Sequence, residues 1–156
     1  MEQVLICVAT GCGLGDSRWL PGTVGALLGL PLVWLIAKTV LWKQFAIAVI
    51  LCFLAGVVCE SAEQRMTGAD PRAIVADEYL TLPVAAIGLP VTRHPALLVL
   101  VFTVSRALDG IKPPPARLAE RIPGGAGIVL DDIVTNIYAL AIGLLANLSV
   151  FRRRAN

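Results

Sequence analysis

Long apolar stretches, separated by two windows rich in charge, make up the pattern of this chain. The stretches cover residues 19–37, 44–59, 79–92, 95–108 and 133–151. None shows the alternation with period two that is typical of strands, so each predicts an apolar helix and the chain an all-α fold. Only the first and the last clearly reach the length of about 18 apolar residues that marks a membrane span. The second is borderline, and the other two suit half-spans, re-entrant segments or buried core helices.

Residues 60–78 and 105–132 form the two charged windows. They hold 15 of the 24 charged side chains and nine of the eleven carboxylates. If every apolar stretch crosses a membrane, both windows and the N-terminal loop lie on one side and the C-terminus on the other. Lys and Arg then divide seven to six between the two sides, so the positive-inside rule gives no orientation.

Proline and glycine positions predict where several helices begin and end. Gly68 can end the helix that precedes it. Asp70-Pro71 has the form of an N-cap followed by proline at the first helical position, which predicts a helix that runs through Asp77-Glu78. Pro83 should kink or end that helix within a turn or two, and the run Pro113–Pro115 must stop the helix before it.

The composition of the chain predicts a membrane protein. Its 156 residues suit a single domain, 1–156. The chain is 57% hydrophobic and 15% charged, with a mean hydropathy of +0.80, whereas soluble domains are about 45–50% apolar and about 25% charged. So few charges cannot cover a surface that faces water, which predicts an integral membrane protein. The arginines at 152–154 then suit an anchor at the level of the lipid headgroups.

Charge and cysteine content exclude several other classes of protein. A net charge of +2, without a basic run interleaved with aromatics, excludes a nucleic-acid partner. Four cysteines without a CxxC motif, beside one histidine, exclude the common zinc patterns. We interpret Cys52 and Cys59 as small buried hydrophobes. Glu2 stands where a signal peptide needs positive charge, so no cleaved signal is expected. No feature of the sequence indicates a protein partner.

Two carboxylate pairs, Asp77-Glu78 and Asp131-Asp132, adjoin apolar helical sequence. Neighbouring residues on a helix point about 100° apart, so each pair directs one group inward and one sideways. If the helices pack together, the inward carboxylates converge, and their repulsion requires a positive charge between them. Oxygen ligands without His or thiolate favour Mg²⁺, with Mn²⁺ or Ca²⁺ as substitutes. The alternative for Asp131-Asp132 is an N-cap at the start of the last helix.

Arg106, Asp109 and Lys112 are candidates for phosphate chemistry. A guanidinium matches phosphate in a bidentate manner, which suits Arg106, while Asp109 can serve as a further ligand or orienting group. Alternatively, Arg106 and Asp109 form an intrahelical pair, and Lys112 is an interface lysine that reaches the headgroups. The glycine-rich turns at 11–25 and 123–127, the second including Gly125, precede apolar helices whose N–H groups can receive a phosphate. Tight turns or close helix packing explain these glycines equally well.

Four blocks of the sequence resemble the phosphatidylglycerophosphatase A family along nearly the whole chain. They are GCGLGDSRWLPGTVGALLGLP, ADPRAIVADEYLTLP, SRALDGIKPPP and GGAGIVLDDIV. The resemblance implies a Mg²⁺-dependent enzyme of the bacterial inner (cytoplasmic) membrane that hydrolyses phosphatidylglycerophosphate in the bilayer to phosphatidylglycerol and phosphate. Soluble relatives that share the acidic motifs imply a compact all-α fold in which other helices surround a central one, with a polar acidic site at helix ends.

The resemblance also implies a set of site residues. In this hypothesis Mg²⁺ is held by Asp77, Glu78, Asp131 and Asp132. Asp109 orients or deprotonates a water, and Arg106 and Lys112 neutralise the developing charge. Thr23 and Gly125 complete the phosphate-binding set. The chain departs from the family pattern at Ala69, Ala76 and Thr81, where the family often has His, Trp and Gly, and at Thr135-Asn136, which replaces a small pair.

Three alternatives to this function remain open. A phosphatase acting on a different lipid phosphate would keep the acidic motifs and change their surroundings. A small ion- or proton-conducting protein would use intramembrane acids as a relay, which predicts acids spread across the membrane depth rather than gathered in two windows. A scaffold without enzymatic activity would use the acids only as helix caps.

Overall fold

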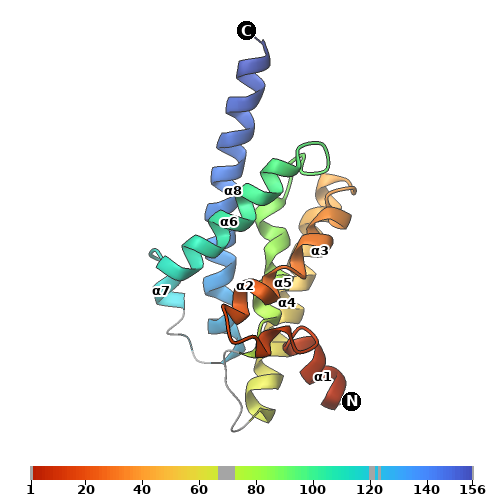
Figure 1. Ribbon diagram of the computed structural model, residues 1–156, viewed down its shortest axis with the longest axis vertical. Helices are drawn as coiled ribbons and strands as arrows, with labels where there is room; N and C mark the ends of the chain where they lie inside the picture. The colour runs from red at the N-terminus through yellow and green to blue at the C-terminus, as the bar shows by residue number, and fades with distance from the viewer. Residues whose placement is uncertain (1, 67–72, 120–121, 123, 156) are drawn as a thin grey trace.

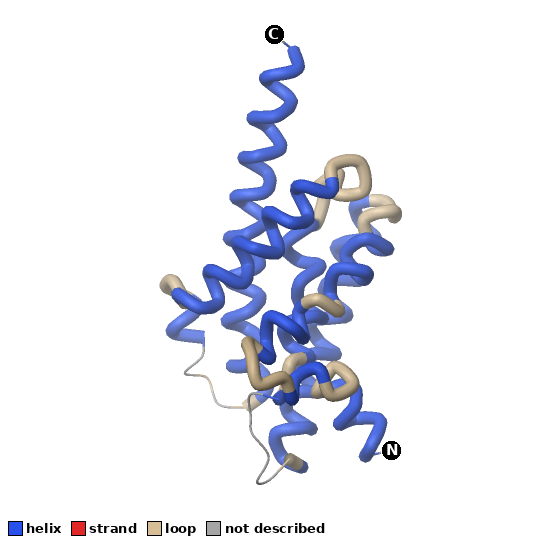
Figure 2. The backbone as a smooth tube through the Cα atoms, in the orientation of Figure 1, coloured by secondary structure: helices blue, strands red, loops and turns tan. Residues whose placement is uncertain are grey.

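The computed structural model describes residues 2–66, 73–119, 122 and 124–155, with side chains described as far as residue 149. Within these residues every regular element is a helix (Figure 1 and Figure 2), which confirms the all-α prediction. The elements are α1 (Glu2–Ala9), η1 (Leu14–Asp16), α2 (Pro21–Ala26), α3 (Gly29–Ile36), α4 (Leu41–Arg65), α5 (Ala76–Thr81), η3 (Leu82–Ala86), α6 (Pro95–Ile111), α7 (Ala116–Ala119) and α8 (Gly125–Ala155).

The short helix α5 and its continuation η3 form the centre of the molecule. They pack against α2, α3, α4, α6 and α8 (Figure 1), and Val75, Leu82 and Ala85 have no exposed surface. Pro83 has no N–H to donate, so the α-helix tightens into a 3₁₀ helix where it enters. Both the break at Pro83 and the central helix with others around it are confirmed.

Two long helices, α4 and α8, run antiparallel on one side of this centre and pack against each other (Figure 1). Among the described residues, Leu41–Arg65 and Gly125–Ser149 are the helices long and apolar enough to cross a membrane. A helix of 25 residues is about 37 Å long at a rise of 1.5 Å per residue, and the hydrocarbon core of a bilayer is about 30 Å thick. The borderline stretch 44–59 therefore lies within a helix of full length.

The stretch 19–37 does not form the single membrane-length helix that we predicted. It is divided into α2 and α3, because Pro31 lacks the N–H that would bond to the carbonyl of Leu27. Close packing also shapes this region, since a Cβ on Gly25 would lie 2.5 Å from Cβ of Val75. The stretch 79–92 is likewise not one helix, because it contains the end of α5, η3 and a loop.

The predicted helix from Asp70-Pro71 through Asp77-Glu78 is wrong in its described part. Gly68 and Asp70-Pro71 lie outside the described residues, and α5 begins only at Ala76. The backbone N–H of Val75 donates to the carbonyl of Ala9 at 2.8 Å, so the approach to α5 is bonded to the end of α1. The N-cap alternative for Asp131-Asp132 is also wrong, because α8 begins six residues before Asp131, at Gly125.

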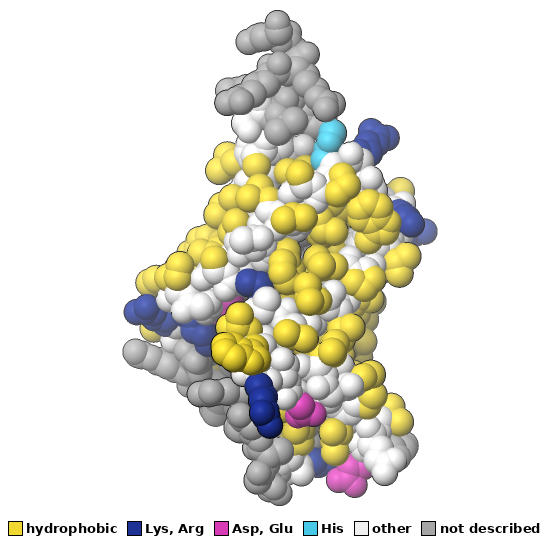
Figure 3. All heavy atoms as spheres, viewed as in Figure 1, with side chains coloured by type: hydrophobic (Ala, Val, Ile, Leu, Met, Phe, Trp, Pro, Cys, Tyr) yellow, Lys and Arg dark blue, Asp and Glu magenta, His cyan; other side chains and the backbone are white. Residues whose placement is uncertain are grey.

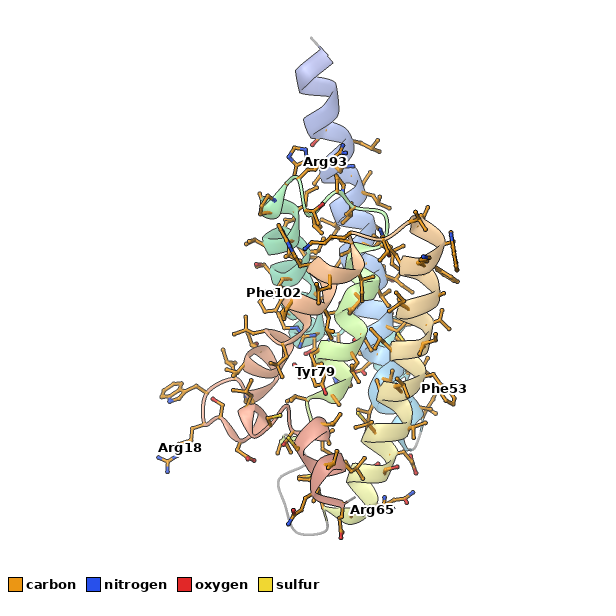
Figure 4. The ribbon with its side chains drawn as sticks, turned by 90° about the vertical axis from the view of Figure 1, so that its right-hand side faces the viewer. Arg18, Phe53, Arg65, Tyr79, Arg93 and Phe102 are labelled. Atoms are coloured by element: carbon orange, nitrogen blue, oxygen red, sulfur yellow. The ribbon has the colours of Figure 1, made fainter. Side chains whose placement is uncertain are left out.

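The two ends of the molecule carry different parts of the chain. Arg18 and Arg65 lie toward one end and Arg93 toward the other (Figure 4), as expected if the N-terminal loop and the window 60–78 share a side. Apolar side chains cover much of the upper and middle part of one face (Figure 3), and Asp and Glu are visible mainly near its lower end. The proline run acts as predicted: α6 ends at Ile111, and Lys112 caps it with a left-handed backbone, φ 49°.

Candidate active site

Arg106 is surrounded by carboxylates from three helices. Its Nη1 lies 2.7 Å from Oε2 of Glu78 on α5 and 3.7 Å from Oδ2 of Asp109 on α6, and its Nη2 lies 3.6 Å from Oδ1 of Asp132 on α8. The Arg106 side chain is 8% exposed. Asp109 is therefore an intrahelical partner of Arg106, as the alternative proposed, but Glu78 is the closer one. The ion pairs connect α6 to both carboxylate pairs.

Several polar atoms in this cluster are buried and have no hydrogen-bond partner among the described residues. They are Oδ1 of Asp77, Oδ2 of Asp132, and Nε and Nη2 of Arg106. Nε and Nη2 belong to the same edge of the guanidinium, the edge that binds an oxyanion in a bidentate manner. Because buried polar groups normally have partners, two anionic oxygens and one cationic edge in the same cluster indicate a site for ligands of both signs.

Lys112 forms a further ion pair of the site. Its Nζ donates to Oδ2 of Asp131 at 2.9 Å, with side-chain exposures of 30% and 9%. The left-handed backbone of Lys112 turns the chain sharply after α6, and Tyr138 on α8 donates to the carbonyl of Pro114 at 2.8 Å. The proline run is thus bonded to α8. This bond and the turn at Lys112 hold the lysine beside Asp131-Asp132.

A pocket of ≈ 330 Å³ opens beside Arg106. Residues of α2, α5 and α6 line it, among them Leu20, Thr23, Glu78, Arg106 and Asp109. Gly22, the neighbour of Thr23, lies close to Glu78, and a Cβ at this position would lie 2.0 Å from Oε1 of Glu78 and displace the carboxylate. Gly22, in the first turn of α2, therefore contributes to the site mainly by leaving room for a carboxylate.

Burial dominates the electrostatics of α5. It raises the pKa of Asp77 well above its usual range, and the neighbouring charge of Glu78 raises that pKa further. Burial also raises the pKa of Glu78 to about 7, although the positive charge of Arg106 opposes this shift. Asp131 contributes to both shifts, so the pair on α8 interacts electrostatically with the pair on α5.

Charge in the site does not balance. With Asp109, the two pairs make five carboxylates, and in the described part of the chain their ion pairs are with two cations, Arg106 and Lys112. Within the described residues, no group of three or more His, Cys, Asp or Glu side chains is placed so that it could hold a metal ion. The protein alone therefore offers an excess of negative charge with Arg106 among the acids.

A chain of buried hydrogen bonds, which the sequence did not lead us to expect, lies next to the acids. Ser105 donates to Oδ1 of Asn136 at 2.6 Å, and Nδ2 of Asn136 donates to Oγ1 of Thr81 at 2.9 Å. All three residues have no exposed surface. Thr81 and Asn136 each follow an acid by four residues, Asp77 and Asp132. A polar residue four positions after an acid, within an apolar stretch, is the feature of the sequence that could have indicated these hydrogen bonds.

Gly125 lies apart from the lining of the pocket at Arg106. Its backbone N–H donates to the carboxylate of Glu60, in a contact between the start of α8 and the end of α4. A Cβ on Gly125 would lie 2.5 Å from the carbonyl oxygen of Gly56, so this glycine allows close packing of the two long helices. The structure thus brings together Thr23, Glu78, Arg106 and Asp109 at the pocket, and it gives the Gly125 N–H a carboxylate partner.

Comparison with known proteins finds matches that extend over most of the chain. A family model described as phosphatidylglycerophosphatase A matches residues 7–147. A phosphatidylglycerophosphatase A of Escherichia coli K12 is 33% identical over 137 residues, covering 86% of this chain and 78% of the relative. The corresponding Haemophilus influenzae protein is 32% identical over 137 residues, with 86% and 83% covered.

A third relative has a different name. It is a putative phosphatidylinositol-3-phosphatase of Bacteroides thetaiotaomicron, 31% identical over 140 residues, with 86% of this chain and 87% of the relative covered. No solved structure matches the chain.

Proposed function

The chain belongs to the phosphatidylglycerophosphatase A family, and from that premise we propose that it removes the terminal phosphate of phosphatidylglycerophosphate with the help of Mg²⁺. The products are phosphatidylglycerol and inorganic phosphate. One observation carries the proposal: within the described part of the chain, the buried Nε–Nη2 edge of Arg106 has no hydrogen-bond partner and lies beside a pocket, with Asp132 only as close as 3.6 Å to Nη2. Such a guanidinium edge binds two oxygens of a phosphomonoester in a bidentate manner.

Mg²⁺ fits the donor set of the site. Oδ1 of Asp77 and Oδ2 of Asp132 are buried oxygens without hydrogen-bond partners, and hard oxygen donors suit this ion. Mg²⁺ is commonly bound through one or two carboxylates, with waters and substrate phosphates as its other ligands, so a complete protein cage is not required. We propose Asp77 and Asp132 as the principal ligands, with Glu78 and Asp131 in support. When bound, Mg²⁺ supplies positive charge against the phosphoryl oxygens.

Residues of this chain bind the phosphate, supply further positive charge and accept a proton. Arg106 binds two oxygens of the phosphate through Nε and Nη2, while its Nη1 stays paired with Glu78. Lys112, held by Asp131, adds positive charge at the proline turn. Asp109 is the most exposed carboxylate paired with Arg106, at 29%, and lines the pocket, where it can accept a proton from the attacking water. Thr23 offers a hydroxyl from the opposite wall.

A membrane setting suits both the substrate and the protein. The acyl chains of the lipid remain in the bilayer, and only the phosphate must reach the pocket. Exposed apolar side chains occur along both α4 and α8, including Phe45, Phe53, Ile142 and Leu145, and such a surface is stable in lipid rather than in water. We therefore propose an integral protein of the bacterial inner membrane in which α4 and α8 cross the bilayer.

A second candidate substrate is another lipid phosphate. The relative named as a putative phosphatidylinositol-3-phosphatase shows that similar chains carry different substrate names. In this chain Thr81 and Asn136, which depart from the family pattern, hydrogen-bond to each other beside the acids. An ion-conducting relay is less well supported, because the acids gather around Arg106 instead of being spread along α4 and α8.

The test is phosphate release by the purified protein in detergent, with Mg²⁺ and then with excess EDTA. The substrates are phosphatidylglycerophosphate, phosphatidylinositol 3-phosphate and phosphatidic acid, and Asp132→Asn serves as the inactive control. We expect Mg²⁺-dependent release, fastest from phosphatidylglycerophosphate. Faster release from phosphatidylinositol 3-phosphate would select the second candidate, and no metal-dependent release from any of the three would refute the proposal.

A further inference from the structure

Two of the most exposed apolar side chains of the protein are neighbours at the pocket. Trp19 is 82% exposed and Leu20 is 72% exposed, and Leu20 lines the pocket beside Arg106. Full burial of one large apolar side chain is worth about 1.5–3 kcal/mol relative to water. Two such side chains side by side, next to a site for a lipid headgroup, indicate contact with an apolar phase.

The turn that carries them has a defined shape. Leu20 has φ 48°, in the left-handed region that side chains with a Cβ rarely adopt. Its carbonyl accepts from the N–H of Val24 at 3.0 Å, and the hydroxyl of Ser17 donates to the carbonyl of Trp19 at 3.1 Å. The turn is thus bonded on both sides of Leu20 and presents Trp19 and Leu20 outward instead of toward the core.

The turn carries one charge of each sign, exposed Asp16 and exposed Arg18, and of the two Arg18 is the neighbour of Trp19. Arg18 is exposed and directly precedes Trp19, and tryptophan beside a basic residue is typical of the level of lipid headgroups. Arg18 lies toward the end of the molecule that also carries Arg65 (Figure 4). In Figure 3 the apolar surface extends over the upper and middle part of this face, with acidic groups mainly below it.

A second tryptophan occurs toward the other end. Trp42, at the start of α4, is 68% exposed, and the amine of Lys43 lies 5.6 Å from the centre of its ring. Gly88 donates to the side chain of Gln44 at 2.9 Å, which ties this start of α4 to the loop that leads to Arg93. A bilayer between the two ends would therefore meet an exposed tryptophan with an adjacent cation at each interface.

We propose that Trp19, supported by Arg18 and Leu20, is a membrane-interface anchor that inserts at the boundary between headgroups and acyl chains. The anchor holds the mouth of the Arg106 pocket at the depth of the lipid phosphate. This inference rests on the proposed function, because it assigns the source of the substrate as a bilayer that the pocket faces directly. The partner is a lipid surface with anionic headgroups, which complement Arg18.

Depth-dependent fluorescence quenching tests the anchor. The chain has three tryptophans, so the full-length variant Trp34→Phe/Trp42→Phe leaves Trp19 as the only one. It is reconstituted in phosphatidylcholine–phosphatidylglycerol vesicles that carry brominated acyl chains. We expect bromine near the carbonyl group to quench Trp19 more strongly than bromine near the terminal methyl group. No quenching, or stronger quenching by the deeper bromine, would overturn the proposal. The matched control, Trp19→Phe/Trp34→Phe, reports Trp42 at the opposite interface.

Steady-state kinetics distinguish a role of Trp19 in membrane binding from a role in phosphate hydrolysis. For Trp19→Asp we expect the KM for lipid phosphate in vesicles to rise about tenfold, with kcat within about twofold. Hydrolysis of a soluble short-chain phosphomonoester should not change, and Trp19→Phe should restore most of the KM. An unchanged KM in Trp19→Asp would overturn the proposal. If no lipid phosphate is hydrolysed, the proposed function fails, while the quenching result still decides the position of Trp19.

Discussion

The side-chain amide of Asn136 donates a hydrogen bond to Oγ1 of Thr81 at 2.9 Å in the fully buried centre of the protein. Thr81 follows Asp77 on α5, and Asn136 follows Asp132 on α8, each by one turn. The bond therefore joins the two helices that supply the proposed metal ligands. It sets the distance between their acids without contact with the substrate, so it is a positioning interaction.

A double-mutant cycle on Thr81→Ala and Asn136→Ala measures that interaction. Each single change leaves a buried polar partner unsatisfied and should lower the free energy of unfolding by about 2 kcal/mol. The double variant should cost about 1 kcal/mol less than the sum, because neither partner remains. Reversible unfolding in mixed micelles provides the measurement. Thr103→Ala, an exposed site on α6, is the control, and strict additivity would contradict a direct bond.

The sequence predicted the parts of the site that depend on local pattern. Carboxylates next to apolar stretches cost too much to be incidental, so Asp77, Glu78, Asp131 and Asp132 could be selected. The arginine three residues before Asp109 could be selected for the same reason. Proline geometry predicted the end of α6 and the change at Pro83, because those restrictions act within a few residues.

What the sequence did not predict depends on contacts between distant segments. The start of α8 is bonded to Glu60, 65 residues before Gly125, so Asp131-Asp132 could not be placed within the helix from local signals. The room for Glu78 depends on Gly22, which belongs to another helix. The role of Asn136 depends on both Ser105 and Thr81. Each is a tertiary contact that overrides a local preference.

Arg106→Lys tests the bidentate phosphate clamp. Lysine keeps the positive charge, but it lacks the Nε–Nη2 edge that stands without partners. We expect kcat/KM for lipid phosphate to fall by about 10²-fold or more, measured as initial rates of phosphate release. Arg93→Lys, an exposed site at the other end of the molecule (Figure 4), should change the rate less than about twofold. Equal effects of the two changes would remove Arg106 from its assigned role.

Gly22→Ala tests the packing of α2 against the carboxylate of α5. The new Cβ would lie 2.0 Å from Oε1 of Glu78, so the carboxylate must move away from its ion pair with Arg106. A displacement of this size should lower kcat by about tenfold or more. The control is Gly56→Ala in α4, where a Cβ meets no atom within 4 Å, and its activity should stay at the wild-type level. Wild-type activity in Gly22→Ala would show that the Glu78 position is not critical.

Glu60→Gln distinguishes the two roles open to Gly125. In the structure the Gly125 N–H donates to the Glu60 carboxylate, so this group acts in helix packing and capping. A neutral amide is a weaker acceptor, and we expect the melting temperature to fall by at most a few degrees, about the effect of a weakened cap. Steady-state rates should not change. A lowered KM for lipid phosphate would instead indicate that Glu60 competes with phosphate for this N–H.

Asp132→Asn tests the metal by its effect on stability in addition to activity. Among the described residues, Oδ2 of Asp132 is a buried oxygen without a hydrogen-bond partner, and the carboxylates of the site outnumber the cations paired with them, so one buried negative charge less should reduce their repulsion. In EDTA the variant should therefore melt at a higher temperature than the wild type, although it releases no phosphate. Mg²⁺ should raise the melting temperature of the wild type, since a ligand at about 100 times its Kd stabilises by about 2.7 kcal/mol. It should leave Asp132→Asn unchanged, whereas Asp16→Asn, at an exposed position, should respond like the wild type. An equal response to Mg²⁺ in Asp132→Asn and the wild type would exclude Asp132 as a ligand.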